Sequence, residues 1–117
     1  MDKTNGELIH AVHIDDLESF EVTDGITGRR LPKTDLVGAW LYDFEPGSVW
    51  PNTDHHLAEE RYYVTKGEIV DNGILYSAGT YVVFSAGSSH RPTSPNGGQI
   101  IGISDARPTA ENAVAAG

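Results

Sequence analysis

The chain has 117 residues, the length of one ordinary domain, and its 13 Gly and 6 Pro indicate many turns and few long helices. Its 17 acidic residues against 8 basic ones give a formal net charge of −9, which argues against binding to nucleic acid. Cysteine is absent, which excludes disulfides and thiolate metal sites, and no apolar run is long enough to cross a membrane. With no apolar leader in the first residues, the expected location is the cytoplasm.

Short segments with apolar alternation and β-branched or aromatic residues predict strands, and Gly, Pro and Asn separate them. We expect an acidic connector at Asp15–Ser19 and turns at Gly25–Gly28 and Pro46-Gly47. Lys66-Gly67 is expected to end a strand, and Asp71-Asn72-Gly73 to close a hairpin. The expected strands are, in chain order, Glu7–Ile14, Val37–Phe44, Arg61–Thr65, Glu68–Val70, Ile74–Tyr76, Thr80–Phe84 and Gln99–Ser104.

This series of short strands predicts an all-β sandwich or barrel. Residues 1–104 are expected to form a single β-barrel domain with N-terminal strands. Residues 105–117 are small and polar, and we expect them to be a flexible C-terminal tail.

Three of the five histidines stand near carboxylates or in a loop that follows a strand. His55 and His56 directly precede Glu59 and Glu60, and His90 lies about thirty residues later, after a β-prone segment. Imidazole and carboxylate together suit Zn, Fe(II), Mn or Ni. By itself, a His-His pair near glutamates also fits surface charges that flank a turn.

The segment Gly47–Gly67 resembles the first motif of the cupin superfamily. That motif has a Gly, then His-x-His, a Glu three or four residues later, and a Gly seven residues after the Glu. Glu60 and Gly67 fit the last spacing, but His-x-His is not present as such. Counting back from Glu60 places ligands at Asp54 and His56, whereas counting forward from Gly47 places them at Thr53 and His55.

The segment Gly79–Ser94 resembles the second cupin motif. Gly79, Gly87 and His90 stand at its conserved spacing, Ser85 replaces its Pro, and Ser94 replaces its Asn. The two motifs occur in the right order at the right separation, and the resemblance extends over about Val37 to Ser104. The small cupins related to zinc-containing anti-sigma factor domains and to acetylacetone dioxygenase-like proteins are the most similar group.

The resemblance implies a single-domain cupin jelly-roll β-barrel that binds one divalent transition metal per chain. Fe(II) is favoured, and Zn, Mn or Ni are the alternatives. The implied ligands are His56, Glu60 and His90, with His55 or Asp54 as the fourth. On a regular strand His55 and His56 point to opposite faces, so both can enter the barrel only across a bulge. A metal-free cupin that has lost a ligand is the other interpretation.

Aromatic residues near the two motifs are candidates for a substrate pocket. Tyr62 shares a strand face with Glu60, and a phenol near a cation can act as a proton donor or base, so Tyr62 is the catalytic candidate. Ordinary barrel packing is the other interpretation of Tyr62, and the more common role of Tyr in a sheet. The candidate pocket residues, which also fit a plain core, are Trp40, Tyr42, Trp50 and Phe84.

These features predict a metal-dependent enzyme that acts on a small organic molecule, foremost a non-haem dioxygenase of diketone-like or phenolic substrates. A non-oxidative lyase, isomerase or cyclase is the first alternative, and a metal- or ligand-sensing binding module without catalysis is the second. The expected partners are a small-molecule substrate or ligand and a second copy of the chain. Val12, Ile14 and Val22 make pairing of sheet edges into a homodimer plausible.

Overall fold

A computed structural model describes residues 2–4 and 7–106, with side chains from residue 9 onward. Within these ranges the regular secondary structure is strand apart from one short 3-10 helix, η1 (Ile14–Asp16), and no helix is long and apolar enough to cross a membrane. The strands are β1 (Asp2–Thr4), β2 (Glu7–Ile9), β3 (Ser19–Thr23), β4 (Ile26–Arg30), β5 (Val37–Phe44), β6 (Ser48–Val49), β7 (Asp54–His55), β8 (Glu60–Asp71), β9 (Ile74–Ser77), β10 (Tyr81–Phe84), β11 (Ser89–His90), β12 (Thr93–Ser94) and β13 (Gly98–Asp105).

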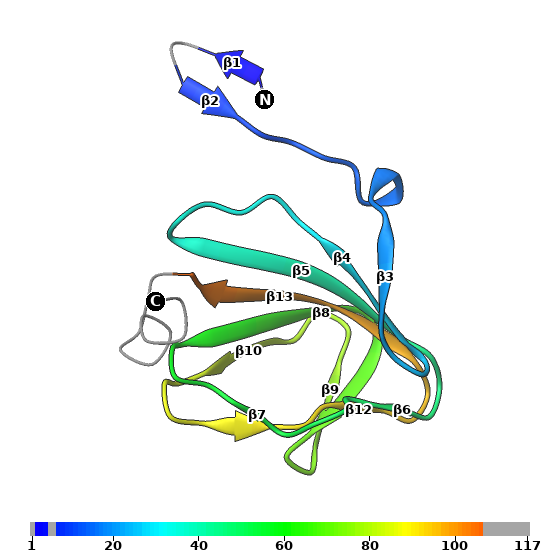
Figure 1. The fold of residues 1–117 in the computed structure, drawn as a ribbon. Coiled ribbons are helices and arrows are strands. Elements are labelled where there is room, and N and C mark those ends of the chain that lie inside the picture. The colour runs from blue at the N-terminus through cyan, green and yellow to red at the C-terminus, as the bar shows by residue number, and fades with distance from the viewer. Residues whose placement is uncertain (1, 5–6, 107–117) are drawn as a thin grey trace.

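Nine of these strands form one curled sheet (Figure 1). Its order is β3-β4-β5-β13-β8-β12-β6, and β9 and β10 also pair with β8. The antiparallel ribbon of β7 and β11 lies across the open side of this sheet and faces its concave surface (Figure 1). The all-β half-barrel confirms the fold class expected from the sequence.

Strand β8 joins the two walls of the half-barrel. Its first half pairs with β13 and β10, and its second half pairs with β9 and β12. The change occurs at Gly67, whose φ of +63° is left-handed. A Cβ at Gly67 would clash with the carbonyl oxygen of Gly97. The strand therefore bends where only glycine fits.

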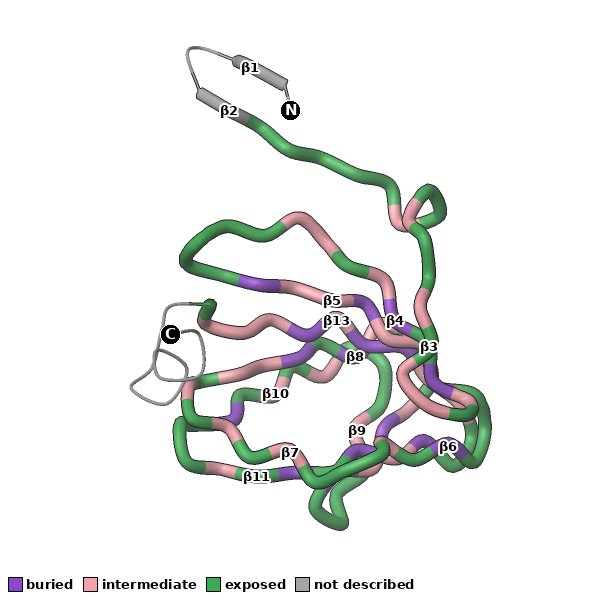
Figure 2. Tube along the Cα trace, viewed as in Figure 1, coloured by how far each residue is buried: buried purple, intermediate pink, exposed green. Residues whose placement is uncertain are grey.

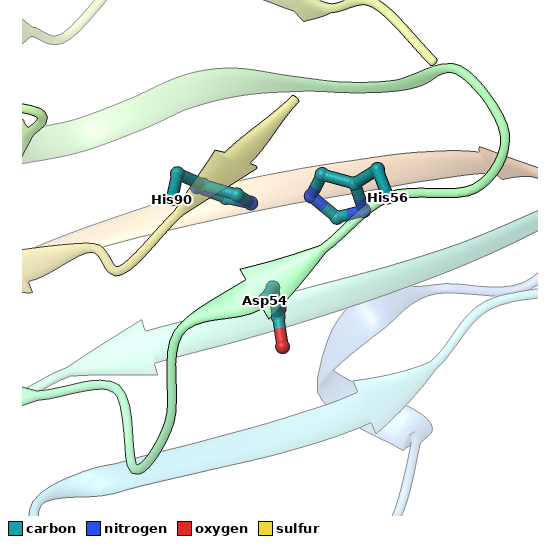
Figure 3. A group of neighbouring side chains, drawn as sticks. All are labelled: Asp54, His56 and His90. Atoms are coloured by element: carbon teal, nitrogen blue, oxygen red, sulfur yellow. The ribbon is translucent and has the colours of Figure 1, made fainter. Parts of the chain in front are cut away.

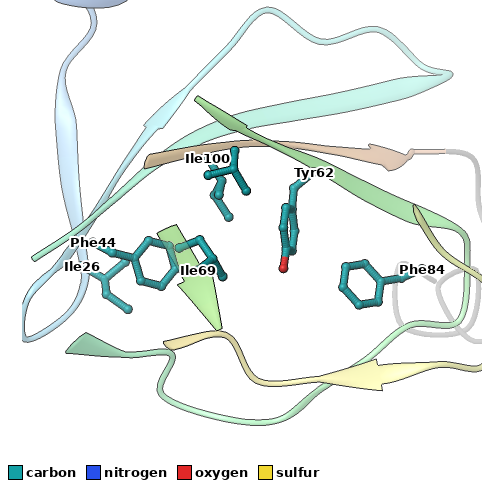
Figure 4. Packing of buried hydrophobic residues seen from close by; sticks show 7 residues of the cluster. Ile26, Phe44, Tyr62, Ile69, Phe84 and Ile100 are labelled. Carbon is teal, nitrogen blue, oxygen red and sulfur yellow. The ribbon is translucent and has the colours of Figure 1, made fainter. Parts of the chain in front are cut away.

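The hydrophobic core fills the concave side of the sheet (Figures 2 and 4). Alternation along β8 turns Tyr62 and Val64 inward, where they are 1% and 0% exposed, and leaves Tyr63 at 42% on the outer face. The buried cluster consists of Ile26, Phe44, Tyr62, Val64, Ile69, Phe84 and Ile100.

Several expected elements agree with the structure. Val37–Phe44 is a strand with the bounds expected. Asn72 and Gly73, with φ of 51° and 77°, close a two-residue hairpin in which Asp71 faces Ile74. The positive φ values explain why an Asn-Gly pair marks this turn.

Other expected elements were wrong in their limits. The strand expected over Glu7–Ile14 ends at Ile9, and the 3-10 turn begins at Ile14. The expected turn Gly25–Gly28 is confined to its first residues, because β4 already begins at Ile26. Lys66-Gly67 does not end a strand, since β8 bends at Gly67 and continues to Asp71. The last strand runs on to Asp105, and residues 107–117 of the expected tail lie outside the described residues.

Candidate metal centre

The ribbon of β7 and β11 determines which side chains face the barrel interior. His90 lies directly opposite Asp54, and Ser89 lies opposite His55. The ladder continues past the strand ends, because the His56 amide donates to the Ser88 carbonyl at 2.9 Å. Residues paired across an antiparallel ladder share one face, and alternate residues along a strand share it too. Asp54, His56 and His90 consequently lie on one face of the ribbon, and the two imidazole rings point toward each other (Figure 3).

These three side chains form a compact group of possible metal ligands. One ligand atom from each of Asp54, His56 and His90 lies within 4.8 Å of the others. Glu60, at the start of β8, lies beside them. Its Oε2 is 3.2 Å from Nδ1 of His56, and its Oε1 is 3.7 Å from Nε2 of His90. Two imidazoles and two carboxylates thus converge in one place.

The group fits a divalent transition metal. Among the described residues, three buried side-chain polar atoms lack a hydrogen-bond partner, and two of them are Nε2 of His56 and Nε2 of His90. Buried polar atoms without a partner are uncommon, because each one loses its hydration without compensation. Imidazole nitrogen and carboxylate oxygen are suitable donors for Fe, Mn, Ni or Zn. A cation bound between the rings would give both nitrogens a partner.

The sequence left His55 and Asp54 open as the fourth ligand, and the structure places them differently. His55 is exposed, and strand alternation places it on the opposite face from Asp54 and His56, so no bulge turns it inward. Asp54 belongs to the compact group. Of the other expected ligands, His56 and His90 lie in the group and Glu60 lies against both of them.

A cavity of about 190 Å³ opens onto this group. Drug-sized sites have volumes of about 300–1,000 Å³, so this one suits a small molecule. Three of the four expected pocket residues, Trp40, Tyr42 and Trp50, line it. Phe84 is not among the lining residues; it is 8% exposed and stacks on His90 with ring centroids 4.1 Å apart. Phe84 is therefore a core residue that supports one face of the His90 ring.

Two tyrosines in the cavity wall differ in what their hydroxyls can do. Burial and the nearby Glu60 and Asp54 raise the pKa of Tyr42 to about 12, so its phenol stays protonated and can donate a hydrogen bond. Burial and the neighbouring Asp71 raise the pKa of Tyr62 still further. The Tyr62 hydroxyl donates to Oδ2 of Asp71 at 2.9 Å. Of the two roles expected of Tyr62, proton donor or base, this geometry disfavours the base, because the hydroxyl stays protonated and is bonded to Asp71.

The carboxylates around His90 favour a positive charge at that position. Burial lowers the pKa of His90, but its hydrogen bond to Asp71 and the nearby Glu60 carboxylate outweigh that effect and raise the pKa to about 9. In the metal-free chain a proton supplies that charge, and a bound cation would take its place.

Asp71 is the residue that the sequence did not reveal. The sequence predicts it as part of a turn, the ordinary place for Asp before Asn-Gly. In the structure its side chain is 1% exposed and contacts His90. A signal is present in the alternation, since Asp71 is two residues after the buried Ile69 and shares its face. That signal has no meaning until the inward face of β8 is known.

Residues 9–106 match the family model of the ChrR Cupin-like domain, and the chain belongs to this family of cupins. The expected resemblance is thereby confirmed. No curated protein matches the chain in sequence.

Three solved structures show the same fold. The polyketide cyclase RemF from Streptomyces resistomycificus aligns with a TM-score of 0.76 at 15% identity, over 86% of this chain and 81% of that one. A putative acetylacetone dioxygenase from Methylibium petroleiphilum aligns at 0.75 and 20% identity, over 99% and 98%. The anti-sigma factor ChrR of Rhodobacter sphaeroides, solved in complex with SigE, aligns at 0.72 and 19% identity, over 80% and 52%.

Proposed function

We propose that this chain is a metal-dependent enzyme that acts on a small organic molecule, foremost a non-haem dioxygenase of diketone-like or phenolic substrates. The observation that carries the proposal is the pair of buried, unpartnered Nε2 atoms of His56 and His90 beside two carboxylates, at the wall of a small aromatic cavity. The similarity in fold to a putative acetylacetone dioxygenase over nearly the whole chain supports the oxidative version.

Asp54, His56, Glu60 and His90 would hold the metal. A divalent ion there supplies Lewis acidity toward substrate oxygens and, if it is iron, redox chemistry toward dioxygen. We favour Fe(II), with Zn, Mn or Ni as the other possible ions. The two carboxylates, Asp54 and Glu60, give the site up to two negative charges. These charges balance those of one divalent cation.

The cavity walls supply binding and orientation. Trp50 packs edge-on against Tyr42, with ring centroids 5.0 Å apart, which fixes both rings at the cavity. A planar substrate would lie against these rings and exclude water from the reacting atoms. The protonated Tyr42 hydroxyl is available to donate to a substrate oxygen, whereas Tyr62 is already bonded to Asp71.

The proposal is tested with protein purified without chelators or an affinity metal. Its metal content is measured by plasma mass spectrometry, and the protein is then reconstituted separately with Fe(II), Zn, Mn and Ni. We expect about one equivalent of metal per chain and oxygen uptake with acetylacetone or a phenolic substrate only in the Fe(II) form. Retention of metal without oxygen uptake on any such substrate would reject the dioxygenase, and failure to bind any of the four metals would reject the metal site.

A non-oxidative cyclase, lyase or isomerase is the second candidate, favoured by the similarity in fold to the polyketide cyclase RemF. Substrate turnover by the Zn form without oxygen consumption would support it. A sensing module is the third candidate, since the matched family is described by ChrR. Metal-dependent binding to another protein, with no turnover, would support that function.

The homodimer and the cytoplasmic location stay predictions. Several apolar side chains are exposed on the outer face of the curled sheet, and a second copy is the partner we propose for them. Sedimentation velocity at micromolar concentration tests the dimer. The exposed residues of that face are Val37, Tyr63, Tyr81 and Val83.

A further inference from the structure

Asp71 is a buried carboxylate that the proposed chemistry does not use. Its side chain is 1% exposed, although Asp is almost never fully buried in proteins unless it is paired. It lies at the end of β8, and the alternation of that strand turns it to the same side as Ile69. Burying a carboxylate costs free energy, so a specific partner is required to keep it there.

The partner is His90. Nδ1 of His90 is 2.6 Å from Oδ2 of Asp71, and the two side chains are 3% and 1% exposed. The same oxygen accepts a hydrogen bond from the Tyr62 hydroxyl at 2.9 Å. A carboxylate can only accept hydrogen bonds, so the shared proton belongs to Nδ1 of the imidazole.

This contact determines which nitrogen of His90 faces the metal centre. With the proton on Nδ1, the lone pair of the neutral ring is on Nε2. That atom is buried, has no hydrogen-bond partner among the described residues, and lies 3.7 Å from Oε1 of Glu60. Phe84 stacks on the ring at an interplanar angle of 23°, which restricts its tilt.

We infer that Asp71 is a positioning residue that holds His90 in the tautomer and orientation required of a metal ligand, with Tyr62 fixing the carboxylate from its other side. The inference rests on the proposed metal site. A carboxylate behind a ligating histidine also makes the ring a stronger donor, and loss of such a partner typically lowers metal affinity about 10–100-fold.

The test measures Zn²⁺ affinity directly, by competition with a chromophoric chelator, in wild type, Asp71→Asn and Asp71→Ala. We expect Asp71→Ala to bind about 10–100-fold more weakly. Asp71→Asn should lose less Zn²⁺ affinity than Asp71→Ala, because its amide oxygen can still accept a hydrogen bond from Nδ1 of His90. Some loss is still expected, because the amide carries no charge. Should Asp71→Ala fail to fold, Asp71→Asn alone still decides the question.

Two comparisons separate positioning from plain stability. Ser94→Ala removes another buried polar group, whose hydroxyl donates to the Glu68 carbonyl at 2.6 Å, away from the histidines. It should be destabilised against urea yet keep its Zn²⁺ affinity. Tyr62→Phe removes the other hydrogen bond to Asp71 and should weaken binding less than Asp71→Ala does.

A spectroscopic readout completes the test. In the Zn-loaded wild type, nitrogen-15 NMR should show His90 with a proton on Nδ1 in slow exchange with water, and in Asp71→Ala that signal should disappear. Wild-type affinity and an unchanged His90 signal in both Asp71 variants would overturn the inference while leaving the metal site intact. A wild type that binds no Zn²⁺ would overturn the metal site and this inference together.

Discussion

At the scale of the residue, neighbouring histidines have opposite environments. His55 is exposed, whereas His56 faces His90 with ring centroids 4.7 Å apart. The difference follows from strand alternation, which the pairing of β7 with β11 imposes on both residues. The sequence presents Asp54-His55-His56 as three possible ligands, and alternation selects the first and the third.

This selection predicts the effect of single substitutions on metal affinity. His56→Ala and His90→Ala should each lower the affinity for Zn²⁺ or Fe²⁺ at least about 100-fold, because a lost ligand costs more than a lost outer partner. Isothermal titration calorimetry measures the effect.

His55→Ala is the matched control, since it removes an adjacent imidazole that lies outside the group. It should bind metal as wild type does. A large loss in His55→Ala together with unchanged binding in His56→Ala would show that the ribbon is in the other register.

At the scale of the element, β8 contributes three side chains that lie in or beside the candidate site. It supplies Glu60 at its start, Tyr62 in the cavity wall and Asp71 at its end. These positions face one interior because β8 bends at Gly67 and passes from one wall to the other. If the strand ended at Gly67, as the sequence predicts, strand alternation would not bring the side chain of Asp71 to His90.

Substitution at the bend is therefore expected to be costly. Gly67→Ala forces a side chain into a left-handed backbone and against the Gly97 carbonyl, so the free energy of unfolding should fall by more than about 2 kcal/mol. Chemical denaturation in urea measures this change.

Gly79→Ala separates the two causes. Gly79 has a φ of +96°, but no atom lies within 4 Å of an added Cβ. Gly79→Ala should therefore lower the free energy of unfolding by only about 1–2 kcal/mol, the cost of a left-handed backbone at a residue other than glycine. Equal losses in the two variants would show that contact with Gly97 is not what requires glycine at position 67.

At the scale of the whole molecule, the candidate metal site joins parts of the chain that are distant in sequence. The ribbon of β7 and β11 contributes Asp54 and His90, and the curled sheet contributes Glu60 and Asp71. A cation held by both would bind only the folded chain, because unfolding separates its ligands. Metal binding at this site would therefore stabilise the folded chain.

The linkage predicts a thermal shift. At a free metal concentration of about 100 times Kd, the folded state should gain about 2.7 kcal/mol, which corresponds to a rise in Tm of about 10 °C for a domain of this size. Differential scanning calorimetry with Zn²⁺ or with EDTA measures it. His55→Ala should show the full shift and His90→Ala none; a shift of wild-type size in His90→Ala would place the metal elsewhere.

The sequence by itself determined the class of fold and most of the candidate ligands. Strand alternation, the Asn-Gly turn and the spacing of the two motifs are local patterns, so they predicted a β-barrel and indicated His56, Glu60 and His90 directly. The sequence also singles out Gly67, but it predicts the end of a strand there, whereas β8 bends at Gly67 and continues to Asp71. A positive φ fits both a turn and a bulge, and only the pairing partner distinguishes them.

The tertiary structure alone decided between Asp54 and His55, moved Phe84 from the pocket to the core, and brought Asp71 to His90. In each case the decision depends on which strand lies opposite and in what register. A shift of one residue reverses the face of every side chain, and residues as far apart as 54 and 90 become neighbours only through that pairing. Local periodicity carries no information about the partner strand, which is why these features were beyond reach of the sequence.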